Sequence, residues 1–294
     1  MPPRTRLLVV HNANAGLKRH RLLDQVCAAL TTAGATVVVE TADGLHAGRQ
    51  LAAKAARTGE FDAVVAAGGD STIRGVAGGL VGTGMPLGII PIGTGNVLAE
   101  ELRLVRSAQG LARYLLEGDV VDVLPGIANG EHFLSMASAG FDVGVLQQLD
   151  MKLKRRIGKL AYVGPILRAL WSQPRRFEAE IDGCSYACTW LIVSKVSRYA
   201  GSLVIAPRQR LTAPGFHALV IDATAPASVA SVLAAIGLGC AEKHPLVRVV
   251  ECQHARVPAG QGVLFQLDGE PLAAPEIEIA IGDAKPLALI TPPA

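Results

Sequence analysis

Residues 61–72 read FDAVVAAGGDST, and residues 87–96 read LGIIPIGTGN. In each stretch, a short apolar run of the kind that forms a buried strand leads into a glycine-rich turn. Ile73–Leu80, after the first turn, has the composition of a short helix. Where a strand turns into a helix, the backbone N–H groups that begin the helix can bind an anion, and glycine lets the anion come close. Two such turns in one chain indicate a site for phosphate groups.

The polar side chains of the two turns fall into two roles. A carboxylate repels phosphate, so Asp70 is expected to hold Mg²⁺, or water bound to Mg²⁺, beside the phosphates. Thr94 and Asn96 offer short hydrogen-bonding groups at a helix start. Either turn alone is equally well explained as an ordinary loop in which Asp or Thr caps the helix, and only the pair favours function. The candidates for nucleotide binding in the turns are Gly68, Gly69, Asp70, Ser71, Thr72, Gly93, Thr94 and Asn96.

Four stretches of the sequence resemble, in order, the signatures of the diacylglycerol kinase catalytic-domain family, which includes bacterial lipid kinases and sphingosine kinases. GGDST at 68–72 and PIGTGN at 91–96 are similar to the family's GGDGT and P-x-GT-x-N motifs. VVHNANAG at 9–16 is similar to a strand that ends in an N-P-x-S-G turn, and LDGE at 267–270 is similar to a D-G-E motif. Four landmarks in family order are hard to obtain by chance.

The resemblance implies a fold, a reaction and cofactors. The expected fold is an N-terminal α/β domain of three layers followed by a β-rich, sandwich-like C-terminal domain, with the nucleotide site in the cleft between them. The expected reaction is transfer of phosphate from ATP, with Mg²⁺, to the hydroxyl group of a diacylglycerol-like or sphingoid-like lipid. The expected partner is therefore a lipid substrate at a membrane surface.

The resemblance also assigns catalytic roles. Asp268 is expected to be the base that accepts the proton of the lipid hydroxyl, and Asp70 is expected to take part as the metal ligand. Glu270 is expected to orient a metal-bound water or to contact the nucleotide. The plainer explanation of Asp268 and the glycine after it is an ordinary hairpin turn.

Three further residues are assigned to binding. Asn12 and Gly16 are expected at the phosphates or the ribose of the nucleotide. Asp142 lies where family members carry a G-F-D-like segment near the acceptor pocket, so it is a candidate for binding the polar head of the lipid. An acid in a turn at the end of a strand is an equally good explanation of Asp142.

The composition is that of a globular enzyme. With 294 residues, half of them apolar, the chain can bury a substantial core and is long enough for two domains. A net charge of +3 is too small to argue for nucleic acid as a partner. No apolar run has the length of a membrane span or of a signal-peptide core, so a cytoplasmic location, peripheral to the inner face of the membrane, is expected. The five cysteines are scattered, which favours reduced thiols.

The pattern of apolar runs changes near residues 122–125. Before this point, β-branched runs alternate with Ala- and Leu-rich helical stretches, which is typical of a parallel sheet covered by helices. After it, strand-like segments follow one another closely. The sequence therefore predicts an α/β domain over residues 1–123 and a β-rich domain over residues 124–294. A homodimer is left open as an alternative to a monomer.

One helical stretch, residues 149–171, interrupts the β-rich region. Basic residues lie there beside apolar and aromatic side chains, a mixture that suits a surface in contact with anionic lipid headgroups. A solvated helix face whose apolar side packs on the sheet is an alternative of equal weight. The basic residues are Lys152, Lys154, Arg155, Arg156 and Lys159.

Three positions depart from the family pattern. Ser71 replaces the fourth residue of GGDGT, and if this position needs a positive φ the backbone is strained by roughly 1 kcal/mol. Arg74 and Gly75 replace an Asn-Glu pair, so a carboxylate expected near the nucleotide is missing. APG at 213–215 replaces an acidic pair, so a structural magnesium ion attributed to those acids is expected to be absent.

Two other functions stay open. An NAD-kinase-like enzyme shares a GGDGT-type turn and a two-domain plan, although the P-x-GT-x-N motif and the basic stretch argue against it. A degenerate kinase that binds nucleotide or lipid without transferring phosphate is motivated by the departures from the family pattern. The retention of Asp70, Thr94 and Asp268 opposes this reading.

Overall fold

The computed structural model describes residues 3–12, 20–150, 161, 163–171, 174–282 and 285–293. The chain divides into two compact units. Residues 1–124 and 284–294 form the first unit, and residues 125–283 form the second. Each unit contains its own sheets.

The first unit is built on a sheet whose central strands are the apolar runs of the sequence. Over the described residues this sheet has six strands in the order β2-β1-β3-β4-β20-β5. Strands β1 to β4 are parallel to their neighbours, whereas β5 pairs antiparallel with β20. All residues of β3 and β4 are buried, as expected for a parallel sheet covered on both faces. The strands are β1 Arg6–His11, β2 Thr36–Thr41, β3 Ala63–Gly68, β4 Leu87–Pro91, β5 Asp119–Val123 and β20 Leu287–Thr291.

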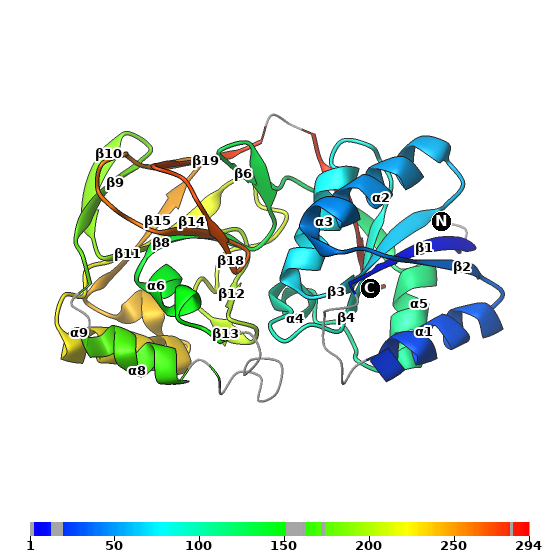
Figure 1. Ribbon diagram of the computed structural model, residues 1–294, viewed down its shortest axis with the longest axis horizontal. Coiled ribbons are helices and arrows are strands. Elements are labelled where there is room, and N and C mark those ends of the chain that lie inside the picture. The colour runs from blue at the N-terminus through cyan, green and yellow to red at the C-terminus, as the bar shows by residue number, and fades with distance from the viewer. Residues whose placement is uncertain are drawn as a thin grey trace. The chain divides into compact units, whose positions relative to one another are not determined.

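Helices cover both faces of this sheet and make the first unit a three-layer α/β structure, as predicted (Figure 1). Helices α2 and α3 pack against each other on one face, and α1 and α5 pack against each other on the opposite face. The side chain of Ser107 caps α5 by accepting a hydrogen bond of 3.1 Å from the N–H of Gly110. The helices are α1 His20–Thr32, α2 Gly44–Thr58, α3 Asp70–Leu80, α4 Val97–Glu101 and α5 Ala108–Glu117.

The contact between α2 and α3 explains one departure from the family pattern. A Cβ atom at Gly75 would lie 2.7 Å from the carbonyl oxygen of Leu45, and one at Gly79 would lie 2.3 Å from that of Arg49. These distances are too short for any side chain, so α3 approaches the backbone of α2 through its glycines. Gly75, where the family resemblance leads us to expect a carboxylate, is therefore a packing position in this chain.

The second unit is a sandwich of two antiparallel sheets, which confirms the predicted β-rich, sandwich-like domain. Over the described residues one sheet has the order β10-β9-β16-β19-β6-β7 and the other β15-β14-β11-β8-β17-β18. The first contains β6 Gly126–Ala128, β7 Glu131–Phe133, β9 Phe177–Ile181, β10 Cys184–Cys188, β16 His254–Val257 and β19 Ile277–Ile281. The second contains β8 Met136–Gly140, β11 Trp190–Ser194, β14 Phe216–Ile221, β15 Val247–Cys252, β17 Phe265–Leu267 and β18 Glu270–Leu272.

The core of the second unit lies between these sheets. Buried side chains from both sheets meet there, and the rings of Phe133 and Phe216 stack with centroids 5.7 Å apart. Among the described residues of this unit, three α-helices, a 3-10 helix and a small two-stranded sheet are attached. They are α6 Phe141–Gln147, α8 Val163–Trp171, α9 Pro226–Gly237, η3 Ala241–Lys243, β12 Arg198–Tyr199 and β13 Leu203–Val204. Among the described residues, no helix combines the length and the apolar character that crossing a membrane requires.

The structure corrects the expected extent of the second domain. The sequence places residues 124–294 there, but β20 at the end of the chain joins the sheet of the first unit between β4 and β5. The apolar segment LALIT forms this strand. Which sheet it joins depends on pairing with residues more than 160 positions away in the sequence, such as Val121 opposite Leu289. The change of unit at Leu124 and Pro125 agrees with the expected boundary near residues 122–125.

Candidate functional site

The first group of candidate residues lies at the carboxyl ends of β1, β3 and β4. In the strand order β2-β1-β3-β4, the strand that follows β1 in sequence lies on one side of β1, and the next strand, β3, lies on its other side. In open α/β sheets a ligand binds where the order reverses in this way, so its crevice is expected outside the carboxyl ends of β1 and β3. Asn12, directly after β1, donates from its side-chain amide to the hydroxyl of Thr72 over 3.4 Å. The structure therefore brings Asn12 and the first glycine-rich turn together.

The two glycine-rich turns also contact each other. The N–H groups of Ile92 and Gly93 donate to the carbonyl oxygen of Gly68 over 3.2 and 3.0 Å. A Cβ atom at Gly93 would lie 2.3 Å from the Cα of Gly69, and one at Gly68 would lie 2.2 Å from the hydroxyl of Thr72. Gly93 is therefore needed for the close approach of one turn to the other, and Gly68 leaves room for the Thr72 side chain within its own turn. Both reasons are independent of the approach of an anion.

Asp70 joins the two turns. It begins α3, and its Oδ1 atom accepts a hydrogen bond of 2.7 Å from the N–H of Val97, the first residue of α4. A Cβ atom at Gly95 would lie 2.7 Å from Oδ2 of Asp70, so this glycine leaves room for the carboxylate. The Asp70 side chain is partly exposed, which leaves it accessible to a ligand.

The start of α3 suits a phosphate. The residue before the helix is Gly69, and no side chain caps this end. Ser71 and Thr72 follow within the helix, and Ser71 is not among the residues with positive φ. The strain considered for Ser71 is therefore absent, because this position forms an ordinary first turn of a helix.

Asn96 in the second turn has a structural role. It precedes α4 with φ of 53°, in the left-handed region that Asn tolerates better than most residues. Its side chain is buried and donates to the carbonyl oxygen of Gly93 over 2.8 Å, which closes the turn. Thr94, between these residues, is partly exposed and is the more accessible of the two polar side chains.

The residues of this site can accommodate a nucleotide with Mg²⁺. Among the described residues no group of three or more His, Cys, Asp or Glu side chains could hold a metal ion on its own. Magnesium in nucleotide sites is commonly held by one or two carboxylates together with phosphate oxygens and water, which one carboxylate such as Asp70 can satisfy. Gly16, also expected at the nucleotide, lies outside the described residues.

The second group of candidates belongs to the other unit and centres on the hairpin between β17 and β18. Asp268 and Gly269 form its two-residue loop with φ of 49° and 84°, the combination found in a type I′ turn. The Asp268 carboxylate is only 8% exposed. It accepts three backbone hydrogen bonds, of 2.9, 2.8 and 3.0 Å, from the N–H groups of Leu134, Ser135 and Met136. Asp268 thus fastens the hairpin to the start of β8.

Glu270 follows this loop as the first residue of β18 and is exposed. Of the two carboxylates in the D-G-E motif, Asp268 is bound to the backbone and Glu270 faces solvent. A base must come within hydrogen-bond distance of the proton that it accepts. The geometry therefore favours Glu270 over Asp268 as the group that can reach a substrate hydroxyl.

Asp142 is buried in the second unit at the start of α6. Its Oδ2 atom accepts hydrogen bonds from the hydroxyls of Ser138, at 2.7 Å, and Tyr199, at 3.4 Å. Burial raises the pKa of Asp142 to about 7, although these hydrogen bonds act in the opposite direction. Phe141 and Tyr199 both contact Trp190, with ring centroids 5.3 and 6.1 Å apart from it.

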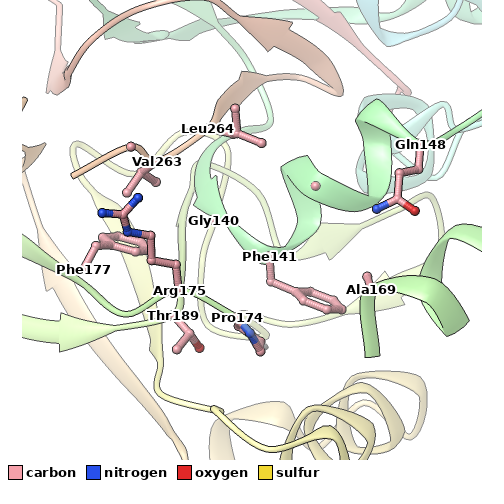
Figure 2. Close-up of a pocket in the computed structure, with 12 residues that line it drawn as sticks. Gly140, Phe141, Gln148, Ala169, Pro174, Arg175, Phe177, Thr189, Val263 and Leu264 are labelled. Atoms are coloured by element: carbon pink, nitrogen blue, oxygen red, sulfur yellow. The ribbon is translucent and has the colours of Figure 1, made fainter. Parts of the chain in front are cut away.

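A small cavity of about 170 Å³ opens beside α6. Its lining is mainly apolar, with Phe141, Phe177 and Leu264 among its side chains, and Arg175 is the one cation among the described residues that line it. Figure 2 shows the guanidinium of Arg175 beside the ring of Phe177, reaching toward Val263. This cavity lies within the second unit and adjoins the segment that carries Asp142.

The segment that lacks the family's acidic pair is held by a lysine. Lys195 follows β11, is fully buried, and donates from Nζ to the carbonyl oxygen of Ala213 and, at 3.5 Å, to that of Gly215. The amide of Gln209 also donates to the Gly215 carbonyl, over 2.9 Å. Burial lowers the pKa of Lys195 to about 8. An ammonium group thus satisfies the carbonyl oxygens of this segment in the structure.

Sequence reasoning missed Ser138, Lys195 and also Gln266, a buried residue of β17 whose side-chain amide donates to the hydroxyl of Ser138 over 2.7 Å. Ser138 lies four residues before Asp142, a spacing that could have suggested the contact. Gln266 and Lys195 lie in apolar, strand-like stretches of the sequence. A polar residue in such a stretch indicates a buried hydrogen bond, but the neighbouring sequence does not identify its partner. The five basic residues of the predicted lipid-binding stretch, residues 152–159, lie outside the described residues.

Comparisons with known proteins agree with these observations. The sequence profile of the diacylglycerol kinase catalytic domain matches residues 6–126, and that of the YegS C-terminal NAD kinase beta sandwich-like domain matches residues 135–290. A diacylglycerol kinase of Bacillus subtilis is 28% identical over 236 residues, which cover 78% of this chain and 76% of that protein. An uncharacterised Synechocystis protein is 35% identical over 125 residues, and the match spans 42% of this chain and 29% of that protein.

A crystal structure of a diacylglycerol kinase from Bacillus anthracis has a TM-score of 0.75. It is 19% identical in sequence and matches over 99% of this chain and 98% of that chain. At this identity the similarity establishes the fold of the two units.

Proposed function

The chain belongs to the diacylglycerol kinase catalytic-domain family, and we propose that it transfers the γ-phosphate of ATP to the hydroxyl group of a diacylglycerol-like or sphingoid-like lipid. The observation that carries this proposal is the pairing of the two glycine-rich turns at the carboxyl ends of β3 and β4, with Asp70 bridging them. The uncapped start of α3 offers N–H donors to phosphate beside a carboxylate that suits Mg²⁺.

In the proposed reaction each unit supplies different groups. The first turn of α3 and the side chains of Asn12, Thr72 and Thr94 bind the phosphates, and Asp70 holds the metal. When bound with the nucleotide, Mg²⁺ supplies positive charge that stabilises the phosphoryl group during transfer. The cleft between the domains, where these groups would meet the acceptor, stays a prediction.

The second unit supplies the acceptor side of the reaction. Glu270 accepts the proton as the lipid hydroxyl attacks phosphorus, and Asp268 keeps the hairpin that carries Glu270 in place. Asp142 binds a polar group of the acceptor near the apolar cavity beside α6. Asp268 is thus assigned to positioning, in place of the role of base that the sequence suggested.

We also propose that the enzyme works at a membrane surface, where its substrate resides. Leu167 on α8 and Leu238 at the end of α9 are exposed by 53% and 81%, and α8 packs against α9. Exposed apolar side chains on neighbouring helices suit contact with lipid. Sedimentation with phosphatidylglycerol vesicles tests this step, and a Leu167→Glu, Leu238→Glu variant that sediments as well as the wild type would contradict it.

Phosphorylation of NAD is the second candidate, because the profile matched by residues 135–290 is described as NAD kinase-like. The test is to incubate the purified protein with γ-labelled ATP, Mg²⁺, a total lipid extract and NAD. We expect the label in the lipid fraction. Label in NADP would select the second candidate, and binding of ATP without any labelled product would indicate a degenerate kinase.

A further inference from the structure

A chain of three hydrogen bonds connects the hairpin loop at Gly269 with the buried carboxyl group of Asp142. The N–H of Gly269 donates to Oε1 of Gln266 over 2.6 Å, and Nε2 of Gln266 donates to the hydroxyl of Ser138 over 2.7 Å. Ser138 in turn donates to Oδ2 of Asp142 over 2.7 Å. Gln266 and Ser138 are 2% and 1% exposed, so bulk water does not compete for the hydrogen bond between their side chains.

The direction of donation along this chain is fixed by its first member. A backbone N–H can only donate, so the Gln266 oxygen must face Gly269 and its NH₂ group must face Ser138. The hydroxyl oxygen of Ser138 then accepts from Gln266, and its proton is free to go to Asp142. The ionised Asp142 carboxylate can only accept, so in this state the Ser138 hydroxyl donates to it.

The hairpin loop is therefore fastened at two points. Asp268 attaches it to the backbone at Leu134–Met136, and Gln266 attaches it to the side chains around Asp142. The first attachment involves backbone groups of the same unit, whereas the second leads to a carboxyl group that lies next to the apolar cavity. Glu270, one residue beyond Gly269, begins β18, which lies near α6.

We propose that Gln266 is a positioning residue that holds the Asp268–Glu270 loop in the orientation required for transfer and links that orientation to the hydrogen bonding of Asp142. This inference rests on the proposed kinase function, because it assigns Gln266 to the proposed reaction. When an acceptor engages Asp142, the same hydrogen bonds fix the loop that carries Glu270. Gln266 touches neither the nucleotide nor the acceptor in this scheme.

The decisive variant is Gln266→Met, which keeps the length of the side chain and removes both hydrogen bonds. Its matched control is Gln209→Met, since Gln209 is also 2% exposed and its amide also makes hydrogen bonds within the second unit. Gln209 donates to the backbone carbonyls of Lys195 and Gly215 rather than to the hairpin loop. Activities are compared per folded protein. We expect Gln266→Met to lower kcat about tenfold or more with KM for ATP within about twofold, and Gln209→Met to change neither by more than about twofold.

A second variant tests the direction of donation. In Gln266→Glu a carboxylate can still accept from Gly269 but can no longer donate to Ser138, and protonation restores the donor. We therefore expect its kcat relative to the wild type to rise as the pH is lowered from about 8 to about 6. Among the described residues, the ionisable groups that belong to this hydrogen-bond chain or to the loop, and that the wild type shares, are Asp142, Tyr199, Asp268 and Glu270.

Amide hydrogen exchange at Gly269 separates this inference from the proposed function. We expect the Gly269 amide to lose protection in Gln266→Met and to keep it in Gln209→Met, whether or not a phosphorylated lipid is formed. An inactive wild type with this exchange pattern would overturn the kinase assignment and the positioning role that rests on it, while upholding the hydrogen-bond link. An active wild type whose kcat falls equally in both variants, or is unchanged in Gln266→Met, would overturn the positioning role alone.

Discussion

The carboxylate of Asp70 accepts a hydrogen bond of 2.7 Å from the backbone N–H of Val97, so a residue that begins one helix holds the start of the next. The two helices follow different strands, and the bond fixes the spacing of the two glycine-rich turns. The same carboxylate is the one that we assign to Mg²⁺. Asp70 therefore has a structural role, and different substitutions can separate it from the metal-binding role that we propose.

Asp70→Asn keeps an oxygen that can accept from Val97 but removes the negative charge. We expect it to lower Mg²⁺-dependent turnover by about 10²-fold or more, because phosphoryl transfer depends on the metal, and to change the stability little. Asp70→Ala also removes the hydrogen bond, which at a charged acceptor contributes roughly 1.5–3 kcal/mol to the free energy of unfolding. Steady-state kinetics and urea unfolding measure the two effects. An Asp70→Asn enzyme with full metal-dependent activity would show that the phosphate site has been misassigned.

Glu270→Gln removes the exposed carboxylate of the hairpin without disturbing a buried contact. We expect kcat to fall by about 10²-fold or more with ATP binding nearly unchanged, because the proton of the lipid hydroxyl loses its acceptor. The stability should remain that of the wild type. Normal turnover in Glu270→Gln would remove this residue from the mechanism.

Asp268→Asn has a different expected outcome. Its amide NH₂ group would face N–H donors of residues 134–136, and a buried donor without an acceptor costs about 1–3 kcal/mol. We expect a loss of stability in urea unfolding together with a loss of activity. If instead Asp268→Asn is as stable as the wild type and inactive, Asp268 is the base after all.

Asp142 makes the stability of the protein depend on pH. Its folded-state pKa of about 7 lies above the ordinary value of 3.8, so the native state binds the proton more tightly than the unfolded chain does. The stability that this group supplies is present below pH 3.8 and is lost as the pH rises through 7. The free energy of unfolding of the wild type relative to Asp142→Asn should therefore decrease between pH 5 and 7, by roughly 1.4 kcal/mol per pH unit at most. If the difference in the free energy of unfolding between the two proteins does not change with pH, Asp142 does not have the raised pKa that burial is expected to cause.

Lys195 gives the opposite trend at higher pH. Its pKa in the folded state is about 8, below the ordinary value of 10.5, so the unfolded chain binds the proton more tightly between these two values. The free energy of unfolding of the wild type relative to Lys195→Met should therefore increase from about pH 8 to about pH 10. Lys243→Met, at an exposed lysine, is the control and should show no such trend. If the difference in the free energy of unfolding between the wild type and Lys195→Met does not change with pH, the ammonium group is not buried as described.

The fold could be predicted largely because its signals are local. The strands β3 and β4 are continuous apolar runs that end in glycine turns, and these turns fix both the strand ends and the position of Asp70. The strand β20 has an equally clear apolar run, but which sheet it joins depends on β4 and β5, far away in sequence. The pairing of strands that are distant in the sequence cannot be predicted from the composition of either strand alone.

The candidate site shows the same limit at the level of single residues. The D-G-E motif predicted a hairpin turn, which the structure contains, but the partners of the Asp268 carboxylate lie more than 130 residues away in the sequence. These partners bind the side chain to the backbone. Gln266 meets Ser138 across two paired strands, β17 and β8, a contact that follows from their register. The motifs therefore selected the candidate residues, whereas the different surroundings of the two neighbouring carboxylates could be seen only in the three-dimensional structure.

The most direct test of the account is the transfer of labelled γ-phosphate from ATP to diacylglycerol in mixed vesicles, measured side by side for the wild type and Asp70→Asn. The account predicts a labelled phospholipid with the wild type in the presence of Mg²⁺ and about 10²-fold less with the variant. A folded wild-type protein that binds ATP but labels neither diacylglycerol nor any lipid of a total extract would contradict the assignment as a lipid kinase.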